Sequence, residues 1–165
     1  MTSAMDSLAF HQHDHRACIE TALETARHVC EQRSARLTPL REHVLQLVWQ
    51  SHKPLGAYAL LEQLTDIAPA GQRRRLGPPT VYRALEFLRE HGLVHRINSL
   101  NAFIGCQHPQ TLHHSYFLIC RRCGSTVELT SELLTGAVQS AAIDARFQAE
   151  GASIEIAGLC PRCQP

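Results

Sequence analysis

Two pairs of cysteines with the same spacing constrain the fold of this chain more than any other feature. One C-x2-C pair lies in LICRRCG and the other in GLCPRCQ, and together they comprise Cys120, Cys123, Cys160 and Cys163. Two such pairs match the tetrahedral coordination that Zn²⁺ prefers, and four sulfur ligands leave no position for water. We therefore predict a structural zinc ion that ties the strand around Cys120 to the C-terminal end of the chain.

The composition favours metal binding over disulfide bonding. The chain has 165 residues, including 7 cysteines and 11 histidines, and 44% of its residues are hydrophobic. The first residues lack the basic start and the apolar run of a secretory signal, and no stretch approaches the roughly 18 apolar residues of a membrane helix. We therefore expect a cytoplasmic protein, in which disulfides are rare, and no membrane partner. Redox-active C-x2-C pairs, the alternative, require a βαβ context that this sequence lacks.

Apolar residues recur at helical spacing through the first half of the chain. They predict a helix over 16–32, a second helix with Thr38 as its N-cap, and a third that begins near Gly56. After an arginine-rich loop, a fourth helix is predicted from Thr80 to a glycine stop at Gly92. Tertiary packing of these apolar faces would form one core.

Two short apolar segments, LVHRI and AFIGC, predict a β-hairpin directly after these helices. The last three of these helices, followed by the hairpin, describe a winged helix-turn-helix, in which the last helix enters the major groove and the hairpin is the wing. We place this domain at 16–107, after a flexible leader at 1–15. The leader contains His11, His13 and His15, which could bind a metal; a flexible tail with adventitious affinity is the alternative.

Residues suited to DNA binding lie on the predicted fourth helix and its neighbours. Arg83 can make a bidentate contact to guanine from the helix that Thr80 starts, and Tyr58 can contact a thymine methyl group or a phosphate. Because the formal net charge is only +1, nucleic-acid contact requires a local basic patch. We assign phosphate contacts to Arg73, Arg74, Arg75, Arg89 and Arg96. A solvated charge run is the alternative for the first three.

After a hinge at 108–114 the pattern changes to a small unit at 115–165. YFLIC, STVEL and ASIEIAGLC predict three strands, with an amphipathic helix in SELLTGAVQSAAIDARFQAE between the second and the third. This helix offers for burial Leu133, Val138, Ala141 and Ala145. Uncovered edge strands would invite pairing with a second copy of the chain. The predicted fold class is therefore α+β, with an N-terminal winged helix-turn-helix and a small C-terminal dimerisation domain.

Three cysteines remain outside the quartet. Cys18 and Cys30 fall in the first predicted helix, where a free cysteine most often packs as a small apolar side chain. Cys106 ends the predicted wing. A second tetrahedral zinc shell could be formed by Cys106 together with His95, His113 and Glu128.

Two other histidines leave the ligand assignment open. His113 and His114 are adjacent, so a strand would point them to opposite faces. Either His108 or His114 could serve a further metal site, although a lone histidine in a turn is more often solvated.

Four segments carry a family resemblance: LTPLREHVLQLV, PPTVYRALEFLREHGLVHRI, HHSYFLICRRCGSTVEL and GLCPRC. From about Cys30 onward the chain resembles the ferric-uptake-regulator superfamily, and most closely its zinc uptake regulators. The resemblance implies a homodimeric metal-sensing repressor that binds operator DNA, an inverted repeat, and takes no small-molecule substrate. It implies two zinc ions per subunit, a structural one on the cysteine quartet and a regulatory one on His95, Cys106, His113 and Glu128. The family places base contacts at the positions of Tyr58 and Arg83.

Ligand chemistry independently favours zinc over iron. A thiolate in the sensing shell suits Zn²⁺, whereas Fe²⁺ and Mn²⁺ prefer imidazole and carboxylate at higher coordination number. An iron-sensing member of the superfamily is one alternative. A constitutive winged-helix DNA-binding protein with structural zinc only is another.

Catalysis is not expected from the sequence. Zinc deaminases combine H-x-E with P-C-x-x-C, whereas here the proline lies inside the pair CPRC and no histidine stands two residues before a glutamate. The chain also has no G-x-S-x-G, Walker loop or H-E-x-x-H motif.

Overall fold

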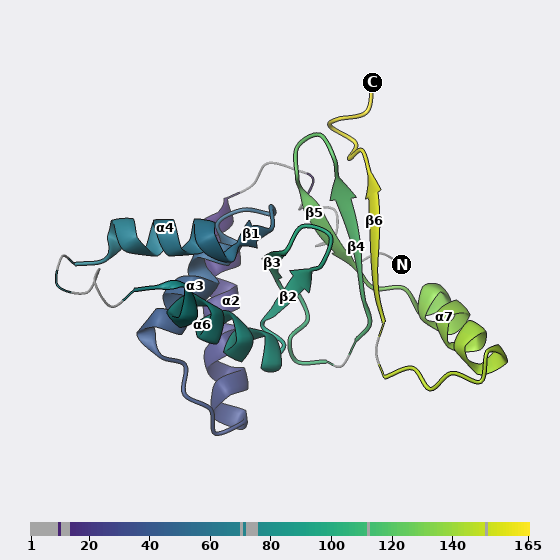
Figure 1. Cartoon of the computed structure of the whole chain (residues 1–165), viewed down its shortest axis with the longest axis horizontal. Helices are drawn as coiled ribbons and strands as arrows, with labels where there is room; N and C mark the ends of the chain where they lie inside the picture. Colours follow the sequence, from purple (N-terminus) through teal and green to yellow (C-terminus); the bar gives the residue numbers. More distant parts are fainter. Residues whose placement is uncertain (1–9, 11–13, 70, 72–75, 112, 151) are drawn as a thin grey trace. The chain divides into compact units, whose positions relative to one another are not determined.

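A computed structural model describes residues 10, 14–69, 71, 76–111, 113–150 and 152–165 (Figure 1). The chain forms two compact units. The N-terminal unit runs from His13 to Thr111, and the C-terminal unit runs from Leu112 to Pro165 and includes Phe10. Among the described residues, no helix is both long enough and apolar enough to cross a membrane.

Four helices form the core of the N-terminal unit. Their bounds are α2, His15–Gln32; α3, Pro39–Trp49; α4, Ala57–Ile67; and α6, Pro78–Glu90. α3 packs against the other three helices, and α6 also packs against α4. The apolar positions predicted from helical spacing supply the core, including the fully buried Ala26, Val44, Leu60 and Val81. Cys30 is 2% exposed, so it packs as the small apolar side chain that was predicted.

Local signals explain where these helices begin and end. The Asp14 carboxylate accepts a hydrogen bond from the backbone N–H of Arg16 at 2.9 Å and caps α2. α6 begins at Pro78, earlier than the predicted start at Thr80, because proline favours the first helical turn, where its missing N–H costs nothing. Gly92, with φ of +70°, then turns the chain out of α6 as predicted.

The predicted hairpin is present as β2, Val94–Ile97, and β3, Ala102–Gly105, paired antiparallel (Figure 1). A third strand, β1, Leu55–Gly56, pairs antiparallel with β3, so the sheet order is β1-β3-β2. Two residues are too few to show an alternating pattern, and for this reason the sequence did not predict β1. α6 packs on β2 and α3 on β3, which fixes the wing to the helices.

The C-terminal unit contains the three predicted strands. They are β4, Ser115–Cys120; β5, Thr126–Leu129; and β6, Ser153–Gly158, in the order β5-β4-β6. β4 pairs antiparallel with β5 and parallel with β6, so β5 and β6 are the two edges (Figure 1). Tyr116 and Phe117 of the central strand are 0% and 1% exposed. The α+β fold class predicted from the sequence is thus confirmed.

The helix of this unit departs from the prediction. α7, Glu132–Asp144, has no buried residue, although a hydrogen bond of 2.9 Å joins the hydroxyls of Tyr116 and Thr135. The prediction that this helix buries part of its surface is therefore wrong for the single chain. None of the four residues expected to be buried is buried, namely Leu133, Val138, Ala141 and Ala145, and Leu133 is 87% exposed. α7 also ends before the predicted 150, because Arg146 adopts a left-handed conformation with φ of +53°.

Gly105, at the end of β3, lies against the only tryptophan of the chain. A Cβ at this position would come within 2.2 Å of Cε2 of Trp49 and 2.3 Å of its Nε1. Carbon atoms cannot approach so closely, so either the indole or the strand would have to move. Gly136, in α7, offers a contrast, because a Cβ added there would meet no atom within 4 Å.

We expect Gly105→Ala to lower the free energy of unfolding by about 1–3 kcal/mol, the usual cost of overpacking. Urea unfolding followed by Trp49 fluorescence measures this change, because the indole is part of the affected contact. The matched control is Gly136→Ala, which should be neutral or stabilising by up to about 1 kcal/mol, since alanine is the better helix former. Equal unfolding midpoints for Gly105→Ala and the unmodified chain would contradict the packing described.

Candidate metal centres and nucleic-acid interface

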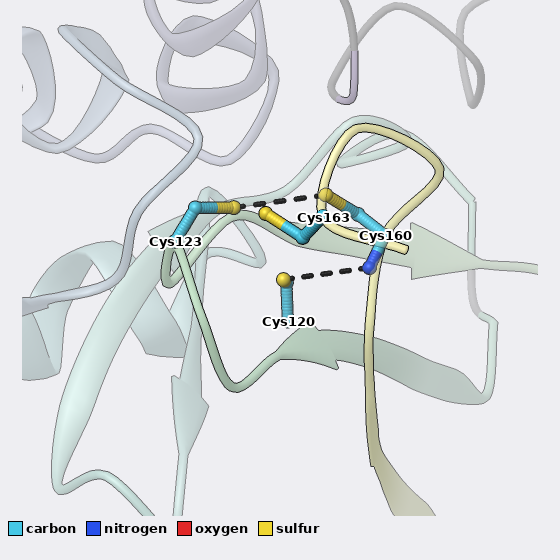
Figure 2. A group of neighbouring side chains, drawn as sticks. All are labelled: Cys120, Cys123, Cys160 and Cys163. Atoms are coloured by element: carbon cyan, nitrogen blue, oxygen red, sulfur yellow. Dashed lines mark hydrogen bonds between the residues drawn. The ribbon is translucent and has the colours of Figure 1, made fainter. Parts of the chain in front are cut away.

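The four cysteines of the two C-x2-C pairs converge in the C-terminal unit (Figure 2). Cys120 ends β4, and Cys160 follows β6, the strand that runs parallel beside it. All four sulfur atoms lie within 4.8 Å of one another, and Sγ of Cys123 is 3.7 Å from Sγ of Cys160. A disulfide would need about 2.05 Å, whereas two sulfurs on one tetrahedral Zn²⁺ are ~3.8 Å apart, given Zn–S bonds of about 2.3 Å. The donor set and its spacing therefore fit zinc.

Backbone hydrogen bonds hold both C-x2-C turns in shape. The N–H of Gly124 donates to the carbonyl of Cys120 at 2.9 Å, and the N–H of Cys163 donates to the carbonyl of Cys160 at 2.8 Å. Gly124 has φ of +76°, the left-handed conformation that glycine adopts without strain. Between the turns, a guanidinium N–H of Arg122 donates to the carbonyl of Cys163 at 2.9 Å. The two cysteine pairs are thus positioned by the fold itself.

The electrostatics of the quartet favour a bound cation. Backbone N–H donors of Cys160 and Cys123 lower the pKa of Cys120 to about 5. A hydrogen bond with Ser125 lowers the pKa of Cys123, whereas burial and the neighbouring sulfurs raise the pKa of Cys163 to about 12. Four thiols this close cannot all ionise without a cation among them. Zn²⁺ would supply the missing charge and make all four thiolate ligands.

A second pair of potential ligands lies on the wing of the N-terminal unit. His95 is in β2, opposite Ile104 of β3, and Cys106 follows β3 directly. The backbone N–H of Cys106 donates to the carbonyl of Leu93 at 3.0 Å, which extends the hairpin by one residue pair. The ligand atoms of His95 and Cys106 lie within 4.8 Å of each other, and Cys106 is 3% exposed. The hairpin therefore presents one imidazole and one thiol together.

A third pair lies in the C-terminal unit, between the start of β4 and the middle of β5. Nε2 of His113 is 2.6 Å from Oε1 of Glu128, and the hydroxyl of Ser115 donates to the same oxygen at 3.3 Å. Glu128 is opposite Phe117 in the sheet and is 2% exposed. A buried carboxylate without such partners would be strongly destabilising, so His113 and Ser115 compensate the burial of Glu128.

The sequence left open a metal-binding role for His108 and His114. Within the described residues, neither His108 nor His114 belongs to a cluster of three or more possible ligands. The carbonyl of His108 accepts hydrogen bonds from the N–H and the hydroxyl of Thr111, so this histidine is part of a turn. His11 and His13 lie outside the residues that the structure describes.

Most of the described residues predicted to contact DNA are exposed on α4 and α6 of the N-terminal unit. Arg83 and Arg89 are exposed on α6, Thr80 is half-buried in its first turn, and Tyr58 at the start of α4 is 71% exposed. Exposure on the face opposite Val81, Leu85 and Leu88 agrees with the predicted helical stripe. Three predicted phosphate contacts, Arg73, Arg74 and Arg75, lie outside the described residues.

A cleft separates α6 from the wing on the same unit. It is lined by Tyr82, Glu86 and Arg89 of the helix and by Arg96 and Asn101 of the hairpin. A guanidinium N–H of Arg96 donates to Oδ1 of Asn101 at 2.8 Å, which fixes the arginine at the tip of the wing. Two cationic side chains, Arg89 and Arg96, thus line the groove between the helix and the hairpin.

Comparison with known proteins decides the family. The model of the ferric uptake regulator family matches residues 32–157. The chain belongs to this family. Among its relatives, the zinc uptake regulation protein of Escherichia coli (strain K12) is 38% identical over 142 residues, which cover 86% of this chain and 80% of the relative.

Solved structures of ferric uptake regulator family proteins share the fold. One described as the crystal structure of holo XcZur is 39% identical, has a TM-score of 0.75, and is matched over 86% of this chain and 95% of that chain. Another, a zinc uptake regulator complexed with zinc and DNA, is 36% identical, with a TM-score of 0.80 and coverage of 88% and 94%. The family and its fold, both expected from the sequence, are therefore confirmed.

Replacing one cysteine of the quartet tests whether it binds a structural zinc ion. We expect Cys160→Ser to lose one bound zinc ion per chain and the fixed structure of the C-terminal unit, because a structural zinc site supplies folding free energy. Metal analysis and limited proteolysis measure the two effects. Cys106→Ser, which removes a buried thiol outside the quartet, should keep the quartet ion and resist proteolysis. A Cys160→Ser protein with unchanged zinc content would contradict the site.

Proposed function

We propose that this protein is a zinc-responsive transcriptional repressor that binds operator DNA as a homodimer when a regulatory zinc ion is bound. The observation that carries the proposal is the thiol of Cys106 beside the imidazole of His95 on the wing. A thiolate selects Zn²⁺ over Fe²⁺, so an iron-sensing role has less support. Relatives named for zinc uptake regulation, at 38% identity, agree with this choice of metal.

Two zinc ions per subunit have different roles in this proposal. The structural ion binds the cysteine quartet, where four sulfurs close the coordination shell. The regulatory ion binds His95, Cys106, His113 and Glu128, the set that the family resemblance implies. The mixed nitrogen, sulfur and oxygen donors of the second set bind zinc less tightly than four thiolates and so suit reversible occupancy.

The regulatory ligands support a coupling between metal and DNA because they come from both units. His95 and Cys106 belong to the wing, and His113 and Glu128 belong to the C-terminal unit. An ion that takes ligands from both would restrict the hinge at 108–114 and select the arrangement that fits DNA. Coupling free energies of this kind are typically about 1–3 kcal/mol, or roughly 5–150-fold in operator affinity.

His113 and Glu128 also suit a site that binds and releases its metal. Their 2.6 Å contact satisfies the buried carboxylate, with the hydroxyl of Ser115 as its other donor. Zinc would replace the proton between the two side chains and keep the carboxylate compensated. The pair can therefore exchange a proton for a metal without leaving a buried charge alone.

DNA recognition is assigned to the exposed face of α6 and to the start of α4. Arg83 and Tyr58 are proposed to contact bases, and Thr80 to contact the backbone at the first turn of α6. Arg89 and Arg96, which line the cleft beside the wing, are proposed to contact phosphates. The same role is proposed for Arg73, Arg74 and Arg75.

Exposed apolar surface in the C-terminal unit supports a homodimer. α7 buries none of its residues, and Leu133 and Ile143 are 87% and 73% exposed. The sheet has open edges at β5 and β6, and Ile156 of β6 is 43% exposed. A second copy would cover this surface and would place two DNA-reading helices on an inverted repeat. We place the repressor in the cytoplasm, without catalytic activity.

The decisive experiment titrates operator binding against buffered free zinc. The operator is first selected from random duplexes by the zinc-loaded protein. Wild type should gain roughly 5–150-fold in affinity as zinc rises. Cys106→Ser should bind weakly at every zinc level, because its regulatory ion lacks the thiolate, yet should remain a folded dimer with the quartet ion. A normal zinc response in Cys106→Ser would refute the regulatory site, and none in wild type would identify a constitutive binder.

Base reading by Arg83 generates a separate prediction. Arg83→Ala should weaken operator binding by about 1–3 kcal/mol, the value of a bidentate contact to guanine, and should change binding to random duplex much less. Arg89→Ala is the matched control; it should weaken both duplexes alike and reduce the salt dependence. Both affinities are measured by fluorescence anisotropy, first at one fixed salt concentration and then across a salt series. Equal losses on the two duplexes for Arg83→Ala would exclude base reading.

A further inference from the structure

A third cluster of metal-ligating side chains lies in the N-terminal unit, apart from both proposed zinc sites. It comprises His15, Cys18 and His52, whose ligand atoms all lie within 4.8 Å of one another. The rings of His15 and His52 have centroids 4.9 Å apart and are tilted by 55°. All three residues are half-buried, so the donors are shielded but remain accessible to an ion from solution.

The fold builds this cluster from two separate segments. His15 and Cys18 are three residues apart in the first turn of α2, which places both side chains on the same face of the helix. The Asp14 cap fixes the start of that turn. His52 comes from the connection between α3 and β1. The cluster therefore exists only in the folded unit, unlike a histidine-rich tail.

We propose that His15, Cys18 and His52 form a third zinc site, with one thiolate and two imidazoles as ligands. Thiolate and imidazole are both zinc ligands, and in sites with three protein ligands water takes the fourth tetrahedral position. The site is independent of the proposed repressor function, because it shares no residue with the quartet or with the regulatory shell.

We expect this site to bind zinc less tightly than the other two proposed sites. It offers three protein ligands, whereas each of the other sets offers four. Zinc must also displace the proton of the Cys18 thiol to bind it as a thiolate. We therefore expect the third ion to bind last and to be removed first by a chelator.

An ion at this site would affect the connection between α3 and α4. His52 lies shortly before β1 and α4, and α4 carries the exposed Tyr58 at its start. An ion held by His52 and by the first turn of α2 would fix the connection that leads into α4. The third zinc would thus stabilise the DNA-reading unit itself.

The test counts zinc ions on the full-length protein by competition with a chromophoric chelator. Wild type should bind three zinc ions per chain, and the double variant His15→Ala/His52→Ala should bind two. The matched control is His28→Ala/His43→Ala, which removes two exposed imidazoles from the same unit and should still bind three. Two equivalents on wild type, or a third equivalent retained by His15→Ala/His52→Ala, would overturn the proposal.

Cobalt identifies the ligands of the third ion. When Co²⁺ is added to protein that already carries two zinc ions, the third equivalent should show a thiolate-to-cobalt absorption band. This band should be absent from Cys18→Ser, in which serine keeps the size of the side chain and the helix intact. A third equivalent without such a band in wild type would show adventitious histidine binding and would contradict the assignment of Cys18. Failure of this site would leave the zinc response of operator binding unchanged, so the two proposals are tested separately.

Discussion

The stability of the C-terminal unit depends on a cation that compensates the negative charge of four closely packed thiolates. Its three-stranded sheet is short, neither α7 nor β6 adds a fully buried side chain, and β6 is held by its pairing with β4. The quartet joins the end of β4 to the turn that follows β6, with sulfurs within 4.8 Å of one another. A tetrahedral cation makes this arrangement favourable, and without one the four thiols repel as they ionise. The fold of this unit and the binding of its metal are therefore one equilibrium.

The ligands distinguish the structural zinc ion from the proposed regulatory zinc ion. Four thiolates from one unit fill the coordination shell of the structural ion, so this ion is expected to exchange slowly. The wing pair, His95 and Cys106, and the sheet pair, His113 and Glu128, each offer only two donors within their own unit. Neither pair fills a tetrahedral shell alone, so the proposed regulatory ion needs ligands from both units. In the proposed mechanism, this incompleteness allows zinc concentration to control DNA binding.

The sequence predicted those features that depend on local patterns. Helical spacing identified the four helices, and the spacing within the C-x2-C pairs identified the quartet. Features that depend on tertiary context were missed: β1 is two residues long, and the exposure of Leu133 on α7 reflects the lack of a packing partner in the same chain. His52 carried no signal, because His15 and Cys18 are far away in sequence and only the fold brings the three together.

Reciprocal coupling between zinc and operator DNA is the central claim for this protein. It is tested most directly by the zinc affinity of the regulatory site, measured with the quartet filled and with operator DNA either absent or saturating. Thermodynamic linkage requires operator DNA to tighten zinc by the same factor by which zinc tightens operator, roughly 5–150-fold. We expect that increase. The same zinc affinity with and without operator would contradict the coupling.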